Sequence, residues 1–185
     1  MFAQGTASST PGVTNKASAK NTGTINIGTK ESVGMYAENN TGNLANVDLH
    51  NAGTININSK SSAGIYAPKS TVSKVGTIKL KDTNDSDGSS AVYISEGGKV
   101  ADTASAEINL GKVNQNRVAY YVNGKDSALA GANIGKITGY GVGVYLQGIS
   151  GDKATLDSNT SKLDYTAQEP LESVESFKVI VPTFE

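Results

Sequence analysis

The sequence predicts an all-β protein, a right-handed parallel β-helix (solenoid) of about five coils. Two short motifs recur along the chain at nearly constant spacing, and each alternates apolar and polar residues as a half-buried strand does. Turn-forming residues fill the intervals between them. The composition agrees, because Gly, Ser, Asn and Thr supply 75 of the 185 residues, whereas a helical bundle would be rich in Ala, Leu, Glu and Lys.

The first motif is a short strand built around an isoleucine. Residues 21–27 read NTGTINI and residues 51–57 read NAGTINI, and looser copies are KVGTIKL at 74–80, SAEINL at 105–110 and IGKIT at 134–138. Burying an aliphatic side chain contributes about 1.5–3 kcal/mol, so the aligned isoleucines are expected to stack as one inner column. They are Ile25, Ile55, Ile78, Ile108 and Ile137.

The second motif keeps the same period and carries a tyrosine. It reads SVGMYA at 32–37, SAGIYA at 62–67, SAVYI at 90–94, RVAYYV at 117–122 and GVGVYL at 141–146. Strict alternation assigns Val33, Met35 and Ala37 to one face, and Gly34 and Tyr36 to the other. The residues that this pattern places in a second inner column are Met35, Ile65, Val92, Tyr120 and Val144.

The tyrosines of the second motif are the candidate binding residues. They are Tyr36, Tyr66, Tyr93, Tyr121 and Tyr145. If they face outward they form a ladder with one ring per coil, and tyrosine is favoured at recognition sites. Two other arrangements remain open at this point: the rings stack only for stability, or they face inward with bonded hydroxyls.

The repeats divide the chain into three parts. Residues 1–20 are expected to be a polar N-terminal segment or cap, residues 21–165 the β-helix repeats, and residues 166–185 a terminal coil, cap or junction with a strand-like FKVIV at 177–181. A third, weaker strand completes some units, as around Val47 and Leu49. The handedness follows from the general preference of parallel crossovers. The period of 23 to 30 residues is too short for a propeller blade.

The motifs N-x-G-T-I-N-I and S-x-G-I-Y-A resemble the passenger repeats of large fusobacterial type V autotransporter adhesins. The resemblance covers about residues 21–165. It implies a long β-helical passenger on the cell surface or secreted, a parent protein anchored in the outer membrane, and a role in virulence through adhesion. The implied partner is a receptor on host or bacterial cells, either protein or glycan. No catalytic residue carries over, and the chain is expected to be a monomeric piece of such a passenger.

Little in the sequence points to catalysis or to a bound metal or cofactor, and we expect none of the three. His50 is the only histidine, so a Ser-His-Asp triad would need it, and it is expected to be an exposed turn residue. The loop from Asp82 to Gly88 holds several oxygen ligands but lacks calcium-loop spacing. A glycan-degrading β-helix enzyme remains the alternative function, with this loop meeting Asp102 and Lys99 of the next coil. A purely structural spacer is the third.

Charge and hydropathy exclude further classes of partner. The formal net charge is −1, which provides no field for attracting nucleic acid. The chain has no cysteine, so disulfides and thiolate metal sites are excluded. No stretch approaches the roughly 18 apolar residues of a membrane-spanning helix, so this segment is not expected to insert into a membrane.

Overall fold

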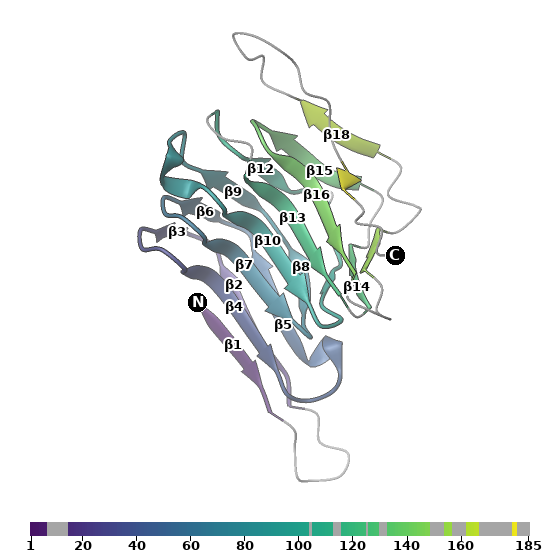
Figure 1. Cartoon of the computed structure of the whole chain (residues 1–185). Helices are drawn as coiled ribbons and strands as arrows, with labels where there is room; N and C mark the ends of the chain where they lie inside the picture. Colours follow the sequence, from purple (N-terminus) through teal and green to yellow (C-terminus); the bar gives the residue numbers. More distant parts are fainter. Residues whose placement is uncertain are drawn as a thin grey trace.

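The chain folds into three parallel sheets that it visits in a fixed order. The computed structural model describes residues 1–6, 15–103, 105–112, 116–124, 126–129, 133–148, 154–156, 162–166 and 179–180. We call the three sheets A, B and C. Each coil contributes one strand to sheet B, then one to sheet C and then one to sheet A, and the chain continues into the next coil (Figure 1). The predicted parallel β-helix is therefore confirmed.

The second motif forms sheet A, the first forms sheet C, and the third strand forms sheet B. Sheet A contains β1 (Phe2–Gly5), β4 (Val33–Asn39), β7 (Ala63–Pro68), β10 (Ser90–Ser95), β13 (Val118–Asn123), β16 (Val142–Gln147) and β19 (Val179–Ile180). Sheet B contains β2 (Ala17–Asn21), β5 (Val47–Asn51), β8 (Thr71–Lys74), β11 (Lys99–Val100), β14 (Ser127–Leu129) and β17 (Ala154–Leu156). Sheet C contains β3 (Thr24–Ile27), β6 (Thr54–Ile57), β9 (Thr77–Leu80), β12 (Glu107–Asn109), β15 (Asn133–Thr138) and β18 (Lys162–Thr166).

The strands continue past both ends of the recognisable motifs. β1 pairs with β4, and β2 pairs with β5, so residues 2–5 and 17–20 belong to the sheets. After the fifth motif, β17, β18 and β19 add one further strand to each sheet. The helical turns among the described residues are the 3₁₀ turns η1 (Leu44–Asn46) and η2 (Asn84–Ser86), and no described helix could cross a membrane.

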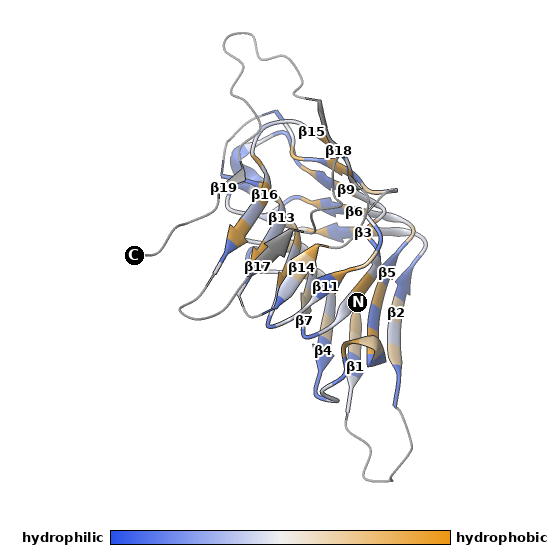
Figure 2. Cartoon of the chain, turned by 90° about the vertical axis from the view of Figure 1, so that its right-hand side faces the viewer, coloured by the Kyte–Doolittle hydropathy of each residue, from blue (hydrophilic) through white to orange (hydrophobic). Residues whose placement is uncertain are grey.

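Both predicted inner columns are present. Paired strands place Ile55 between Ile25 and Ile78, and the same register continues through Ile108 to Ile137. Four of the five are 0–1% exposed. Ile25 is only partly buried, because β3 is the end strand of sheet C. The second column is also buried throughout its length, and Figure 2 shows the alternation of apolar and polar residues along these strands.

In each copy of the second motif, the strict alternation of inward and outward residues fails at one position. Val33 is 38% exposed and Met35 is 0% exposed, yet Gly34 between them is also buried. A Cβ atom on Gly34 would lie 3.1 Å from Ile55 Cγ2, so this position faces the core and not the tyrosine face. The prediction that Val33 points inward with Met35 is therefore wrong. Two consecutive residues turn inward, and Val33 is left on the outer surface.

Buried asparagines hold the corner between sheets B and C. Asn21 Nδ2 donates to Asn51 Oδ1 at 2.8 Å, and Asn51 Nδ2 donates to the carbonyl oxygen of Val75 at 2.6 Å. Asn21 Oδ1 also accepts the backbone N–H of Gly23 at 3.1 Å. A buried polar side chain stabilises a fold only when its hydrogen bonds are made, so the Asn-x-Gly of the motif reflects this corner.

The inner isoleucine column provides a direct test of the stacking. Ile55→Asp should lower the free energy of unfolding by more than about 3 kcal/mol, because a charge would replace a fully buried side chain between two neighbours. Thr54→Asp, one residue earlier on the outer face, should change it by less than about 0.5 kcal/mol. Urea unfolding followed by circular dichroism measures both. Equal losses would contradict the assignment of the two faces.

Candidate functional site

A ladder of stacked aromatic rings lies on the outer face of sheet A. It contains all five predicted tyrosines and begins one strand earlier with Phe2. Successive ring centroids from Phe2 to Tyr145 lie 5.4, 5.4, 4.8, 4.7 and 4.9 Å apart. The Tyr93–Tyr121 pair is edge-to-face with an interplanar angle of 81°, and the other four pairs are stacked. The tyrosines are half-buried and point outward, which excludes the inward-facing alternative. The motifs gave no sign of Phe2, because no copy of the second motif surrounds it.

Hydrogen bonds and burial act on individual phenols of the ladder. Asn123 Nδ2 donates to the Tyr93 hydroxyl at 2.9 Å, and the Tyr121 hydroxyl donates to Gln147 Oε1. Burial raises the pKa of Tyr121, and the neighbouring Tyr93 and Tyr145 add to this effect. Burial, followed by the Glu38 carboxylate, raises the pKa of Tyr36. The phenols of Tyr36 and Tyr121 therefore hold their protons more tightly than free tyrosine does.

A groove of about 510 Å³ runs beside the ladder. In each copy of the second motif, two consecutive residues turn inward. The outward-facing residues on either side of them therefore stand apart, and the space between them is the groove. One wall consists of Tyr66, Tyr93 and Tyr121. The other wall consists of Val33, Ala63, Ser90 and Val118. Glu31 at one rim is the charged residue of this lining, so the groove presents mainly apolar and neutral polar groups.

Serines on successive coils fix the rim of the groove. The backbone N–H of Ser32 donates to Ser62 Oγ at 3.2 Å, and that of Ser62 donates to Ser89 Oγ at 3.0 Å. Ser62 Oγ also lies 3.0 Å from Ser59 Oγ. Each serine thus bridges its own coil to the next, and the wall is preformed.

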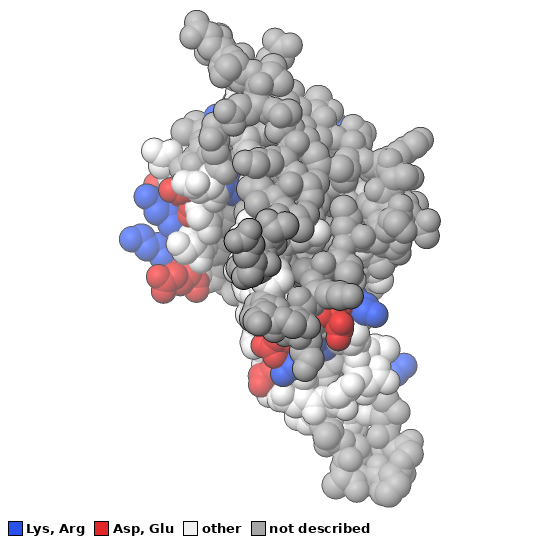
Figure 3. Space-filling view, turned by 45° about the vertical axis from the view of Figure 1, so that its right-hand side comes forward, with Lys and Arg blue, Asp and Glu red and all other residues white. Residues whose placement is uncertain are grey.

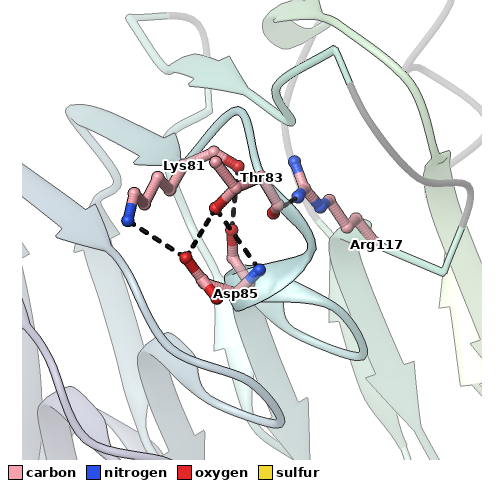
Figure 4. Close-up of polar contacts among 5 residues, drawn as sticks. Lys81, Thr83, Asp85 and Arg117 are labelled. Carbon is pink, nitrogen blue, oxygen red and sulfur yellow. Dashed lines mark hydrogen bonds and ion pairs between the residues drawn. The ribbon is translucent and has the colours of Figure 1, made fainter.

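Arg117 occupies the serine position in the following coil, and it is fully buried. Its guanidinium donates to the carbonyl oxygen of Thr83 at 2.5 Å and to that of Leu110 (Figure 4 shows the Thr83 contact). Burial lowers its pKa, while the carboxylates of Asp82 and Asp87 act in the opposite direction. The arginine ties three segments together and is not accessible to a ligand in the groove.

The acidic loop does not gather its carboxylates around one point. Asp85 Oδ2 accepts from Lys81 Nζ at 3.1 Å and from Thr83 Oγ1 at 2.9 Å, as Figure 4 shows. Asp82 Oδ1 instead accepts the backbone N–H of Lys112 at 2.8 Å. The described part of the chain contains no group of three His, Cys, Asp or Glu residues placed to hold a metal. The loop contacts Lys112 and Arg117 of the next coil, whereas Lys99 belongs to sheet B.

His50 lies within strand β5 and is half-buried, so its assignment to an exposed turn is wrong. Its Nδ1 is 3.2 Å from Ser73 Oγ. Ser73 Oγ donates to Asp48 Oδ2 at 2.7 Å, and the Ser73 backbone N–H donates to Asp48 Oδ1 at 3.0 Å. A catalytic triad needs the aspartate on the histidine and the serine proton directed at the histidine. Here the serine proton goes to the aspartate, which is not the arrangement of a nucleophile and its base.

The raised tyrosine pKa values predict a delayed alkaline titration. The pKa values of Tyr36, Tyr120 and Tyr121 are all raised by burial, so the folded chain holds these protons more tightly than the unfolded chain. This contribution to stability is fully present below the ordinary tyrosine pKa of about 10 and is lost as the pH rises through the folded-state values. Tyrosinate absorbance of the native chain should rise later than that of the chain in denaturant. Superimposable curves would contradict the burial of these phenols.

Comparison of the chain with protein-family models, with curated proteins and with solved structures gives no match.

Proposed function

We propose that this chain is a surface-exposed β-helical passenger segment of an autotransporter-like adhesin, and that the groove on sheet A is its binding surface. The observation that carries the proposal is the preformed groove between the aromatic ladder and a row of small and aliphatic residues. Monomeric proteins rarely expose continuous apolar surface without using it for recognition. The resemblance of the repeats to adhesin passengers supports the same function from the sequence.

The solenoid suits a stalk as well as a binding surface. Coils stack at roughly 4.8 Å each, and every coil contacts its neighbours through three sheets and a continuous core. Such a rod holds its outer faces in fixed positions. In the view of Figure 3, the charged side chains of the described residues stand in separate groups.

The geometry of the ladder restricts what the groove can bind. Most successive rings are stacked on one another, so a ligand meets mainly ring edges and hydroxyls, whereas the planes of Tyr93 and Tyr121 stand at 81° to each other. Flat stacking of a sugar on a tyrosine is therefore disfavoured along the stacked pairs of the ladder. An elongated, largely apolar segment lying along the axis fits better, because both walls run in that direction across several coils.

The glycan-degrading alternative has less support. The chain has one arginine, and this side chain is fully buried. The loop carboxylates are directed at separate partners and do not converge on one bond. A catalytic acid and base would have to lie within hydrogen-bonding reach of the same substrate atoms.

Filling the groove tests the proposal. The double variant Ala63→Arg with Ser90→Arg places bulk and charge on one wall, and its matched control is Thr24→Arg with Thr54→Arg, which changes two adjacent coils on the outer face of sheet C. The labelled 185-residue chain should bind epithelial or bacterial cells, and the groove variant should lose at least tenfold in binding while the control does not. Thermal unfolding of both variants checks that the fold persists.

Three outcomes would contradict the proposal. Equal binding by the groove variant and the control would remove the groove from recognition. Absence of binding by the parent chain to any cell type would favour the structural spacer. Release of reducing or unsaturated ends from pectin, alginate or host glycans would favour the enzyme.

A further inference from the structure

We propose that the outer face of sheet C holds a second binding site, and that its ligand is a carboxylated sugar. A pocket of about 220 Å³ lies on strands β9, β12 and β15, away from the aromatic groove. Three charged side chains surround it: Lys79, Glu107 and Lys136. Neutral hydrogen-bonding groups complete the lining: Thr77, Asn109 and Thr138.

The strand register brings these six residues together in two rows. Thr77, Glu107 and Lys136 are direct partners on successive strands, and Lys79, Asn109 and Thr138 form the parallel row two residues further on. The pocket therefore spans three coils. Because the rungs repeat at roughly 4.8 Å, the two lysines flank the glutamate from opposite corners of one small area.

The same positions in the two preceding coils are uncharged. They hold Thr24 with Asn26, and Thr54 with Asn56. There Asn56 Nδ2 donates to Asn26 Oδ1 at 2.8 Å, so the amides satisfy one another along the sheet. The charges enter only at β9 and continue through β15. This face thus changes from a self-bonded amide ladder to a charged pocket within one solenoid.

The charges around the pocket do not neutralise each other through contact. Among the described residues, ion pairs join Lys69 to Glu96 at 2.7 Å and Lys81 to Asp85 at 3.1 Å, and neither pair belongs to the pocket. Lys136 is the direct strand partner of Glu107, and yet their charged ends do not meet. Two ammonium groups and one carboxylate consequently face the pocket with hydrogen-bonding capacity available to a ligand.

This arrangement matches a sugar that carries one carboxylate. The two ammonium groups supply the charge complement for a carboxylate, and Glu107 can accept a hydroxyl of the same ring. Thr77, Thr138 and the Nδ2 group of Asn109 offer further hydrogen-bonding groups, and Asn109 Oδ1 accepts the backbone N–H of Gly111 at 2.8 Å. Inorganic phosphate matches less well, because it would meet the two ammonium groups without bringing ring hydroxyls to Asn109, Thr77 and Thr138. The pocket is smaller than a typical drug-sized site, which suits a single sugar ring.

Titration of the isotope-labelled 185-residue chain with methyl glucuronide tests the proposal by NMR, and methyl glucoside serves as the probe without the carboxylate. The acid should shift the backbone amides of Asn109 and Thr138, and the neutral sugar should shift neither at the same concentration. Lys79→Ala with Lys136→Ala should weaken binding at least tenfold. The matched control is Lys20→Ala with Lys74→Ala, which removes two lysines two coils apart on β2 and β8 of sheet B. It should leave binding unchanged.

Equal shifts with the two sugars, stronger binding of inorganic phosphate than of the glucuronide, or an equal loss in the sheet B control would each overturn the proposal. The result is independent of the aromatic groove. Ala63→Arg with Ser90→Arg should leave glucuronide binding intact, so failure of one site is distinguishable from failure of the other.

Discussion

In-register stacking of parallel coils is the constraint on which the rest of the structure depends. Each strand residue lies beside its counterpart one coil earlier, so a repeated residue becomes a continuous column. Inside, the columns of isoleucine and of Met35, Ile65 and their successors form a core that no single coil could build. At the B–C corner, the same constraint lets one asparagine bond the next.

Stacking also converts sequence variation between coils into three faces of different chemistry. Sheet A carries the aromatic ladder and its groove, because a tyrosine recurs in each copy of the second motif. Sheet C begins as a threonine and asparagine surface and becomes charged from Lys79 onward. Sheet B carries Ser73, which joins Asp48 to His50 across a bulge in the pairing of β5 and β8. The core tolerates this variety because the outward positions contribute little to it.

The sequence predicts the solenoid and both inner columns well, since periodic repeats and alternation directly reflect stacking. It does not predict the inward turn of Gly34, because a glycine in an alternating strand carries no sign of its face. The groove depends on that turn and was therefore missed. Phe2 was missed because it precedes the motifs. Arg117 and the pocket at Lys79 were missed for a different reason: their surroundings come from neighbouring coils, and only the register reveals them.

The register itself is tested most directly by cysteine pairs on the outer threonine row of sheet C, since the chain has no cysteine of its own. Thr24→Cys with Thr54→Cys, and Thr54→Cys with Thr77→Cys, place the two thiols on adjacent rungs, about 4.8 Å apart at Cα and within disulfide reach. Thr24→Cys with Thr77→Cys places them two rungs apart, at roughly 9.6 Å. The stacked solenoid predicts rapid oxidation of the first two pairs and slow oxidation of the third. Equal rates, or faster oxidation of the third pair, would contradict it.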